Sequence, residues 1–441
     1  MADIERLEIA TLGECHIASP LHELGTGDAV PRFATDLSRI VLDDHVSHAP
    51  PDTPMSDLPS LELAGPRALL YFDPAQIGVG IVTCGGLCPG LNDVIRGLVM
   101  IAWHRYGVRR IVGFRYGYRG FTPSDEPGHQ PLQLTPELVS EIHERGGSVL
   151  ASSRGQQETG RIVDRLVALN LKVLFCIGGD GTLRGALDIA SEVERRGLDI
   201  AVIGIPKTID NDISYIDQSF GFQTAYTAAV EAIQSAHNEA RGTLNGIGLV
   251  KVMGRHSGFL ACHAALATSH VNFCLIPEMP LGPHFADAFA DALHDRLRRR
   301  RHAVVLVAEG FGQDQLQKAG QLQRDASGNV KLIDIGPFLA QRIHDRLGQT
   351  GIEFSLKYID PSYMVRSLPA IPSDSVYCWQ LAQSAVHAAM AGKTRMIVGR
   401  WHNRMVHVPI DAAISRRKLV DPQGDLWLSV LETTGQPAAF G

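Results

Sequence analysis

Two short apolar runs, 172–177 (KVLFCI) and 199–205 (DIAVIGI), each lead directly into a polar loop. Both runs have the length and composition of a buried strand. The loops that follow are GGDGT at 178–182 and PKTIDND at 206–212. In open α/β sheets, ligands bind outside the carboxyl ends of the strands. Glycines let backbone N–H groups approach a polyphosphate, and Asp side chains can hold Mg²⁺ or accept a proton. The two loops therefore predict a phosphate cradle facing carboxylates, as phosphoryl transfer to an alcohol requires.

From Ile77 onward, apolar runs alternate with segments of helical periodicity, which is typical of parallel βαβ units. The predicted strands are 77–83, 109–114, 172–177, 199–205, 246–254, 272–278, 302–310, 354–359 and 395–400. The predicted helices are 91–104, 135–145, 183–196, 223–239, 284–300, 336–347 and 373–391. We expect an α/β protein of two Rossmann-like, three-layer lobes with mainly parallel sheets.

The predicted domains are an irregular N-terminal extension (1–75), a first lobe (76–245) and a second lobe (246–441), with C-terminal segments exchanged between the lobes. The segment HAPPDTPMSDLP at 48–59 predicts an extended stretch within the extension. At 441 residues the chain is too long for one simple core.

Composition excludes several classes of protein. The net charge of −6 argues against nucleic acid or an anionic membrane as a partner. The basic run RLRRRRH at 296–302 fits a solvated helix end better than a nucleic-acid patch. No window is long and apolar enough for a bilayer span, and the N-terminus lacks a secretory pattern. Seven scattered cysteines suggest reduced thiols in a cytoplasmic protein, and no second Cys or His pair completes a zinc site with Cys84 and Cys88.

Single motifs leave alternatives open. The loop TCGGLCPG at 83–90 can present backbone donors to phosphate, but it has neither the Lys-Ser/Thr ending of a P-loop nor a dinucleotide fingerprint. GGDGT alone also fits NAD kinases, lipid kinases or a plain tight turn. PKTIDND is more discriminating, because its Asp-Asn-Asp cluster ends a buried strand.

Three later segments add groups suited to a phosphorylated sugar. MGRHSGF at 253–259 places Arg255 after an apolar strand, where it can clamp a phosphate or form a structural salt bridge. Glu309 follows another strand and could accept sugar hydroxyls. KYIDPSYMVRS at 357–367 offers Lys357, Tyr363 and Arg366 for a second phosphate.

Taken together these motifs resemble the 6-phosphofructokinase family, specifically the atypical ATP-dependent branch of its pyrophosphate-type subfamily. The resemblance runs from about 64 to about 400 and also includes AGPRALLYFDP, GFRYGYRGF, SSRG and LAQSAVHAAMAG. It implies a homo-oligomer, dimer or tetramer, with the active site in the cleft between two lobes. It further implies transfer from ATP to O1 of fructose 6-phosphate, the committing step of glycolysis.

The resemblance also implies residue roles. The expected nucleotide contacts are Gly86, Arg154, Gly155, Gly179, Asp180, Gly181 and Thr182, with Asp180 also coordinating Mg²⁺. The expected substrate contacts are Thr208, Ile209, Asp210, Met253, Gly254, Arg255, Glu309, Lys357, Tyr363, Met364, Val365 and Arg366. Asp210 would take the proton from the 1-hydroxyl, and Arg255 would stabilise charge on the transferring phosphoryl group. Asp212 would help to shape the site.

Two departures from the family pattern matter. Where the bacterial allosteric branch has arginines for the sugar phosphate, this chain has Gly246 and Lys357, which leaves recognition from an adjacent subunit and the effector site open. Donor choice depends on Gly181 and Lys207. Pyrophosphate-using relatives have Asp where Gly181 stands, so we expect ATP; they share Lys207, which keeps pyrophosphate as the alternative. A non-catalytic regulatory subunit would be expected to lose Asp180, Asp210 or Arg255.

Overall fold

The computed structural model describes residues 7–24, 33–45, 48, 53–123, 128–279, 284–316 and 330–440. Its internal contacts divide the chain into two units. The first unit comprises Met1–Thr208, Ile213–Phe220 and Pro369–Arg416, and the second comprises Ile209–Asp212, Gly221–Leu368 and Arg417–Gly441. The boundaries at 75/76 and 245/246 stay predictions about the chain's domains.

The first unit is built on a nine-stranded sheet with the order β3-β4-β17-β16-β10-β9-β6-β7-β8. Its five central strands, from β16 to β7, pair in parallel, and antiparallel pairs flank them. Two small sheets, β1-β15 and β2-β5, complete the unit. The strands are β1 (Ala10–Thr11), β2 (Ile17–Ala18), β3 (Arg39–Val41), β4 (Ser60–Leu63), β5 (Leu69–Leu70), β6 (Gly78–Thr83), β7 (Arg110–Phe114), β8 (Leu132–Gln133), β9 (Leu171–Gly178), β10 (Ala201–Pro206), β15 (Lys393–Thr394), β16 (Met396–Trp401) and β17 (Arg404–Pro409).

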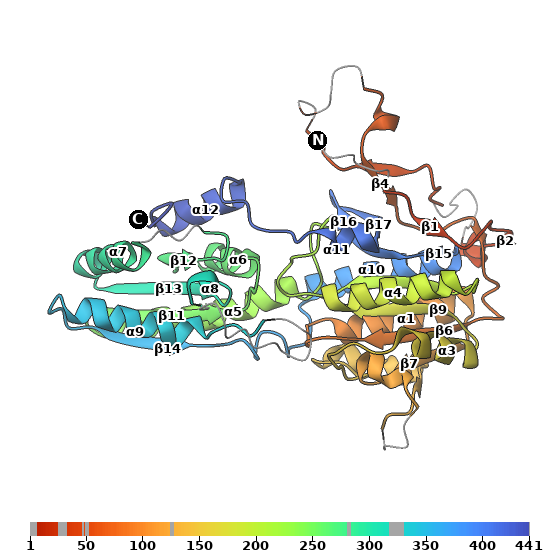
Figure 1. Ribbon diagram of the computed structural model, residues 1–441, viewed down its shortest axis with the longest axis horizontal. Helices are drawn as coiled ribbons and strands as arrows, with labels where there is room; N and C mark the ends of the chain where they lie inside the picture. Colours follow the sequence, from red (N-terminus) through yellow and green to blue (C-terminus); the bar gives the residue numbers. More distant parts are fainter. Residues whose placement is uncertain are drawn as a thin grey trace. The chain divides into compact units, whose positions relative to one another are not determined.

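Helices cover both faces of this sheet (Figure 1). α1 packs with α10 on one face, while α3, α4 and α11 form a second group whose apolar side chains join the core beneath the other. The helices are η1 (Pro20–Leu24), η3 (Met55–Asp57), α1 (Leu91–Tyr106), η4 (Gly117–Phe121), α2 (Pro136–Val139), η5 (Ile142–Glu144), α3 (Thr159–Ala168), α4 (Asp180–Arg195), α10 (Pro372–Met390) and α11 (Ile410–Ser415).

The second unit has a four-stranded, fully parallel sheet with the order β12-β13-β11-β14. Its strands are β11 (Gly246–Val252), β12 (Phe273–Leu275), β13 (His302–Ala308) and β14 (Ser355–Ile359). α5 and α6 pack together on the sheet, and α7 and α9 form a separate pair (Figure 1). The helices are α5 (Phe222–Arg241), α6 (Phe259–Thr268), α7 (Phe285–Arg300), α8 (Gln313–Leu316), α9 (Ile335–Gly348) and α12 (Asp425–Thr434). The expected α/β architecture with mainly parallel sheets is confirmed.

One predicted helix is wrong. The helix expected over 135–145 is a single α turn, α2, followed by the short helix η5. The backbone leaves the helical conformation at Glu141, with φ of −120°. The Asn92 amide donates to the carbonyl oxygens of Ile142 (2.9 Å) and Arg145 (3.0 Å), and these bonds hold the end of the segment against α1.

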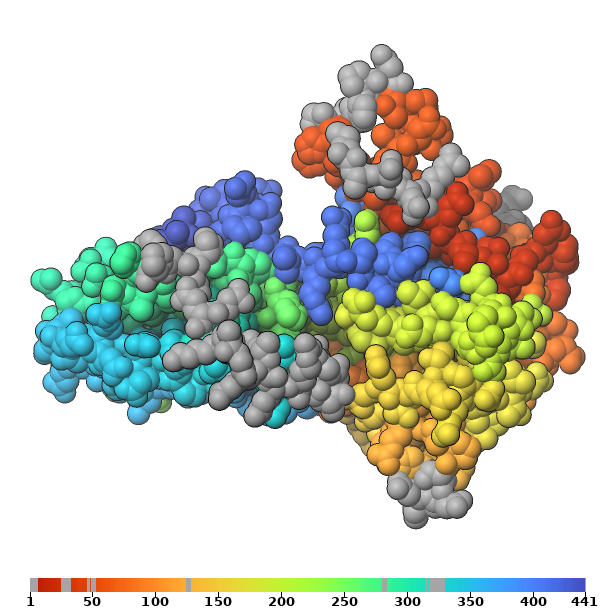
Figure 2. Space-filling view, in the orientation of Figure 1, coloured from red at the N-terminus to blue at the C-terminus, as the bar shows by residue number. Residues whose placement is uncertain are grey.

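The N-terminal extension is less irregular than expected. Its strands β3 and β4 extend the nine-stranded sheet, with β4 pairing antiparallel to β17 from the end of the chain. In Figure 2 the red N-terminal segment lies against blue segments from the C-terminal part of the chain. Of the stretch expected to be extended at 48–59, residues 49–52 lie outside the described residues, and Met55–Asp57 form the short helix η3.

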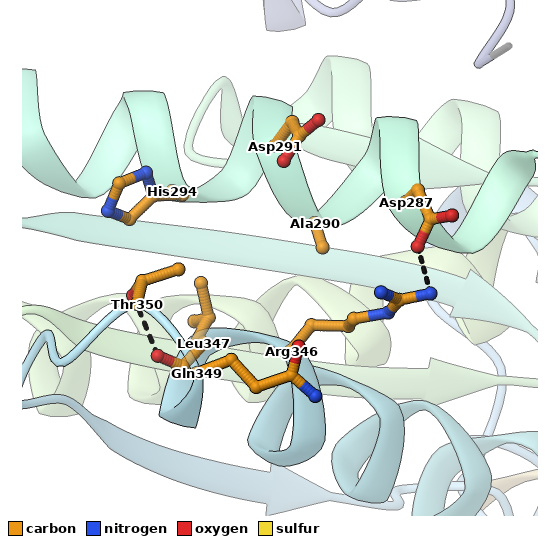
Figure 3. Close-up of a pocket in the computed structure, with 8 residues that line it drawn as sticks. All are labelled: Asp287, Ala290, Asp291, His294, Arg346, Leu347, Gln349 and Thr350. Carbon is orange, nitrogen blue, oxygen red and sulfur yellow. Dashed lines mark hydrogen bonds and ion pairs between the residues drawn. The ribbon is translucent and has the colours of Figure 1, made fainter.

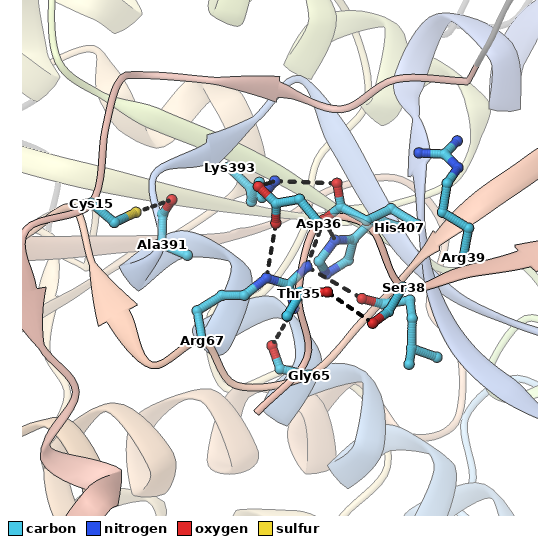
Figure 4. Close-up of polar contacts among 12 residues, drawn as sticks. Cys15, Thr35, Asp36, Ser38, Arg39, Gly65, Arg67, Ala391, Lys393 and His407 are labelled. Carbon is cyan, nitrogen blue, oxygen red and sulfur yellow. Dashed lines mark hydrogen bonds and ion pairs between the residues drawn. The ribbon is translucent and has the colours of Figure 1, made fainter. Parts of the chain in front are cut away.

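A buried cluster of charged side chains connects the N-terminal extension to the C-terminal part of the first unit (Figure 4). Glu62 of β4 lies 2.7 Å from Arg67, 3.1 Å from Lys393 and 2.9 Å from the His407 ring, and all four side chains are buried. Asp36 lies 3.0 Å from both Arg67 and Lys393. Burial alone would raise the pKa of Glu62, but hydrogen bonding to His407 and the nearby Lys393 and Arg67 lower it. The carboxylates therefore balance the two buried cations.

Glu62→Gln should lower the free energy of unfolding by about 3–5 kcal/mol, because the buried Arg67 and Lys393 would keep only the more exposed carboxylate of Asp36. Urea unfolding measures this loss. The control is Glu158→Gln, which breaks the exposed Arg161–Glu158 pair (2.9 Å) and should cost less than about 1 kcal/mol. Equal losses in the two variants would contradict the assignment.

Candidate active site

In the first unit, three loops leave neighbouring parallel strands at one edge of the sheet. Pro206 at the end of β10 pairs with Gly178 at the end of β9, and Thr83 at the end of β6 pairs with Ile177. Because parallel strands point the same way, the loops beginning at 84, 179 and 207 share that edge. Within the first unit, the structure thus brings together the beginnings of the two polar loops and of the glycine-rich loop after β6.

The loop after β6 is held by hydrogen bonds that fix its backbone. Gly85, with φ of 86°, donates its N–H to the carbonyl of Ser153 (3.0 Å), and Ser152 donates its hydroxyl to the Gly85 carbonyl (2.6 Å). Gly90, with φ of 92°, is the N-cap of α1. The neighbouring Arg154 and Gly155 are exposed. This arrangement suits backbone contacts to phosphate at a helix N-terminus.

Packing explains the presence of one glycine in GGDGT but not of another. A Cβ on Gly178 would collide with the Thr182 side chain, which is buried, so packing requires glycine there. A Cβ on Gly181 would meet no atom within 4 Å. Packing of the described residues therefore does not require Gly181, which lies in the first turn of α4.

Asp180 opens α4 and is partly exposed, with 28% of its side chain accessible. Arg184, one turn later, lies 3.2 Å from it. Within the described residues, no three His, Cys, Asp or Glu side chains form a metal-binding group. Mg²⁺ typically takes one or two carboxylates and completes its shell with water and substrate phosphates, so a single carboxylate beside a phosphate loop fits this ion.

Lys207 is buried and joins two of the loops. Its ammonium donates to the Gly86 carbonyl (2.6 Å), and its backbone N–H donates to the Gly178 carbonyl (3.0 Å). Lys207 therefore links the loop after β6 to the end of β9.

In the second unit, the loop after β11 holds Asp210. The backbone N–H of Arg255 donates to the Asp210 carboxylate (3.4 Å), and the Ser257 hydroxyl donates to the Asp210 carbonyl (2.8 Å). Ile209, directly before Asp210, is buried. The second unit thus fixes both the backbone and the carboxylate of Asp210.

The charges around Asp210 perturb its ionisation. Burial has the largest effect on Asp210, and together with the negative charges of Asp212 and Glu309 it raises the pKa of Asp210 to about 7. The hydrogen bond from the N–H of Arg255 and the positive charge of Arg417 lower this pKa, but by less. Arg417 lies 2.6 Å from Asp212. A carboxylate whose pKa lies near neutral pH is well suited to act as a general base.

Arg255 and Glu309 lie on adjoining loops that approach very closely. Gly310 donates its N–H to the Gly254 carbonyl (3.1 Å), and a Cβ on Gly310 would collide with the Arg255 carbonyl. Burial raises the pKa of Glu309, and Arg255 lowers it. The Arg255 nitrogen Nη2 is buried, with no hydrogen-bond partner among the described residues. A buried guanidinium N–H that lacks a partner is suited to an anionic ligand.

The segment 360–367 follows β14 and carries the expected sugar-phosphate residues. Tyr363 and Met364 are 75% and 70% exposed, whereas Val365 is 1% exposed. The Arg366 guanidinium lies 4.5 Å from the centre of the Tyr363 ring. Its charge also lowers the pKa of Glu309, as the charge of Arg255 does.

A family model described as phosphofructokinase matches residues 78–389. The chain belongs to the phosphofructokinase family. It is 49% identical to the ATP-dependent 6-phosphofructokinase of Amycolatopsis methanolica, with 99% of this chain and 96% of that protein covered. It is 45% identical to the ATP-dependent 6-phosphofructokinase of Borreliella burgdorferi, with 98% and 97% covered.

The fold is shared with a crystal structure of a pyrophosphate-dependent phosphofructokinase from Marinobacter aquaeolei. That match has a TM-score of 0.65 and 19% identity, and it covers 82% of this chain and 93% of the other. At this identity the likeness extends to the fold alone. Among the described residues, no helix of this phosphofructokinase is long and apolar enough to cross a membrane.

Lys357 lies apart from the other expected sugar-phosphate residues. It pairs in register with Gly248 in the middle of β11, and a Cβ on Gly248 would collide with Ala236 of α5. Lys357 is therefore exposed on the α5 face of the sheet, short of the carboxyl edge where Glu309 follows β13. Its role in binding substrate stays a prediction.

Sequence reasoning missed several charged residues of this phosphofructokinase that contact the expected site. Arg417 pairs with Asp212, Arg184 with Asp180, and Lys251 with Asp360. Arg184 could have been found from its spacing of four residues after Asp180 on a predicted helix. Arg417 lies far along the chain from its partner, so no local pattern could reveal it.

A pocket of about 310 Å³ lies elsewhere in the second unit, between α7 and α9 (Figure 3). An ion pair between Asp287 and Arg346 spans it, and His294 lies along the same face of α7. None of the expected site residues lines this pocket, so we do not assign the reaction to it.

Asp210→Asn should stabilise the protein more at pH 8 than at pH 5. The folded-state pKa of Asp210 lies above its ordinary value, so wild-type stability falls as pH rises from about 4 to about 7. The neutral side chain avoids this loss, and the gain over wild type should be about 2–3 kcal/mol larger at pH 8. Urea unfolding at both pH values measures it. Asp295→Asn, on an exposed residue, is the control, and a gain at Asp210 independent of pH would contradict the raised pKa.

Proposed function

We propose that this protein transfers the γ-phosphoryl group of ATP to O1 of D-fructose 6-phosphate, giving fructose 1,6-bisphosphate and ADP, the committing step of glycolysis. The observation that carries the proposal is the pairing of Asp210 with the loop of Arg255, in a chain 49% identical to an enzyme named ATP-dependent 6-phosphofructokinase. Phosphoryl transfer relies on positioning and electrostatic stabilisation, which these loops provide.

Asp210 is the general base. Its raised pKa gives the carboxylate enough basicity to accept the proton of the 1-hydroxyl as the oxygen attacks phosphorus. Thr208, Asp212 and Ile209 shape the backbone around it. The ion pair of Asp212 with Arg417 reduces the negative charge beside the incoming phosphoryl group.

Arg255 stabilises the transferring phosphoryl group. Its buried Nη2 is available to the equatorial oxygens, on which negative charge develops in the transition state. Met253 and Gly254 set the course of this loop. Glu309 accepts hydrogen bonds from sugar hydroxyls.

The 6-phosphate of the sugar binds to the exposed segment after β14. Tyr363 and Arg366 reach it with side chains, and Met364 and Val365 contribute backbone contacts, since the Val365 side chain is buried. We keep Lys357 as a further substrate contact.

The nucleotide contacts come from the glycine-rich loops. Gly86, Arg154, Gly155, Gly179, Gly181 and Thr182 border the phosphates, and Asp180 holds Mg²⁺. When bound, the ion neutralises charge on the β- and γ-phosphates. Arg184 pairs with the Asp180 carboxylate, so this ion pair would have to break before Asp180 binds Mg²⁺.

The protein works in the cytoplasm as a homo-oligomer, dimer or tetramer. All seven cysteines carry free thiols, in keeping with a reducing compartment. Size-exclusion chromatography with light scattering would separate the two oligomeric states.

Wild type should use ATP with a higher kcat/KM than pyrophosphate, and Gly181→Asp should reverse this preference. The fold has room for a side chain at 181, but a carboxylate there would repel the α-phosphate of ATP. At about 4 Å and an effective dielectric constant of about 20, the repulsion is about 4 kcal/mol, so kcat/KM for ATP should fall by about 10²- to 10³-fold. Steady-state assays with fructose 6-phosphate and each donor measure both values.

Gly181→Ala is the matched control, since it adds a methyl group without charge, and it should change kcat/KM for ATP by less than about 5-fold. A wild type that prefers pyrophosphate would overturn the donor assignment.

Asp210→Ser should lower kcat by about 10²- to 10⁴-fold, because the base is removed, while ATP binding stays measurable. Single-turnover kinetics and ATP titration separate the two effects. Turnover equal to wild type would overturn the role of Asp210 as base.

A further inference from the structure

Lys251 occupies an unusual position at the end of β11. Its side chain is 11% exposed, and its ammonium lies 2.8 Å from Asp360 and 3.0 Å from Asp334. Burying an ammonium group is unfavourable unless nearby carboxylates compensate for lost hydration, and here two do so. Desolvation lowers the pKa of Lys251, but the hydrogen bonds that its ammonium donates to Asp360 and Asp334 outweigh this effect and leave the pKa raised. The side chain is therefore charged at neutral pH.

Both partners of Lys251 begin structural elements. Asp334 is the N-cap of α9 and accepts the N–H of Gly336 (3.2 Å). Asp360 directly follows β14 and accepts the N–H of Ser362 (3.0 Å), which turns the chain into the segment carrying Tyr363 and Arg366. Lys251 thus joins three points of the second unit: the end of β11, the start of α9 and the start of the 360–367 segment.

Among the described residues, the 360–367 segment is held to the unit by burial at Pro361 and Val365 and by the ion pair of Asp360 with Lys251. Tyr363 and Met364 are exposed, and hydrogen bonds within the segment, such as that from Met364 to Pro361 (2.8 Å), join neighbouring residues. The ion pair between Lys251 and Asp360 is therefore a charged link between the start of this segment and the sheet.

Lys251 also lies two residues before Met253, where the loop of Arg255 begins. The charges of Lys251 and Asp360, together with those of Arg255 and Arg366, all act on Glu309. Charges from the arginine loop, from the segment for the sugar phosphate and from Lys251 thus all act on one carboxylate, that of Glu309.

We propose that Lys251 is a positioning residue that fixes the 360–367 segment, through Asp360, at the distance from the Arg255 loop that the sugar phosphate requires. The inference rests on the proposed function, since it concerns the fructose 6-phosphate site. In this proposal the effect of Lys251 on the position of the segment passes through Asp360.

The test compares three variants of the full chain with wild type. Lys251→Met removes the ammonium, and Asp360→Asn removes only the ionic link to the segment. Asp334→Asn is the matched control: it removes the other ionic link, but asparagine still caps α9. KM for fructose 6-phosphate, KM for ATP and kcat are measured for each, with circular dichroism and thermal unfolding to verify folding.

A displaced phosphate segment weakens sugar binding, and misplacement by about 1 Å can have a large kinetic effect. Lys251→Met and Asp360→Asn should raise KM for fructose 6-phosphate by about 10-fold or more, with kcat changed by less than about 3-fold and KM for ATP by less than about 2-fold. Asp334→Asn should change all three constants by less than about 2-fold.

The measurements distinguish a failure of the proposed function from a failure of the positioning role of Lys251. A wild type that does not phosphorylate fructose 6-phosphate overturns the proposed function. If wild type is active and folded Asp360→Asn keeps KM for fructose 6-phosphate within about 2-fold, the positioning role of Lys251 is wrong. Equal changes in all three constants, shared by Asp334→Asn, would likewise overturn it in favour of a merely structural ion pair. If Lys251→Met does not fold, Asp360→Asn decides alone.

Discussion

The crowding of carboxylates at the strand ends of the second unit is the interaction on which its site depends. The carboxylates of Asp212 and Glu309 repel that of Asp210, and this repulsion adds to the effect of burial in raising the pKa of Asp210. Such a group of charges is stable only when cations share the space. Arg417 pairs with Asp212, the charge of Arg255 acts on Glu309, and the backbone N–H of Arg255 donates to Asp210. The cations that would bind an anionic substrate thus also stabilise these carboxylates.

This balance between carboxylates and cations explains why the Arg255 and Glu309 loops are packed so closely. The N–H of Gly310 reaches the Gly254 carbonyl, and a Cβ at either glycine would collide with backbone atoms. Close approach places the Arg255 loop against the Glu309 loop. Charges act more strongly on one another when they are buried, so the basicity of Asp210 follows from packing as much as from sequence.

Most of the parallel framework could be predicted from the sequence, because buried strands such as β9 and β13 are continuous apolar runs that end in glycine or a polar residue. The loops of Asp180, Asp210 and Arg255 could be located for the same reason. What could not be predicted depends on contacts distant in the chain. Asn92 of α1 binds the end of the segment 135–145, which was expected to be one helix, and Glu62 connects strand β4 to Lys393 and His407. Arg417 and Lys251 were missed because their partners are far away in the sequence.

The difference between what the sequence shows and what the contacts show also affects the inference about the phosphoryl donor. Gly181 and Lys207 pointed in opposite directions in the sequence, one toward ATP and the other toward pyrophosphate. The structure gives Lys207 a role that does not depend on the phosphoryl donor. Its ammonium donates a hydrogen bond to the Gly86 carbonyl, and its backbone N–H donates to the Gly178 carbonyl. A lysine required by the loops carries little information about the donor. Gly181 has no such role, because a side chain there would meet no atom within 4 Å. A residue that the fold does not require is better explained by the ligand, and a missing side chain beside the nucleotide loop favours the larger donor, ATP.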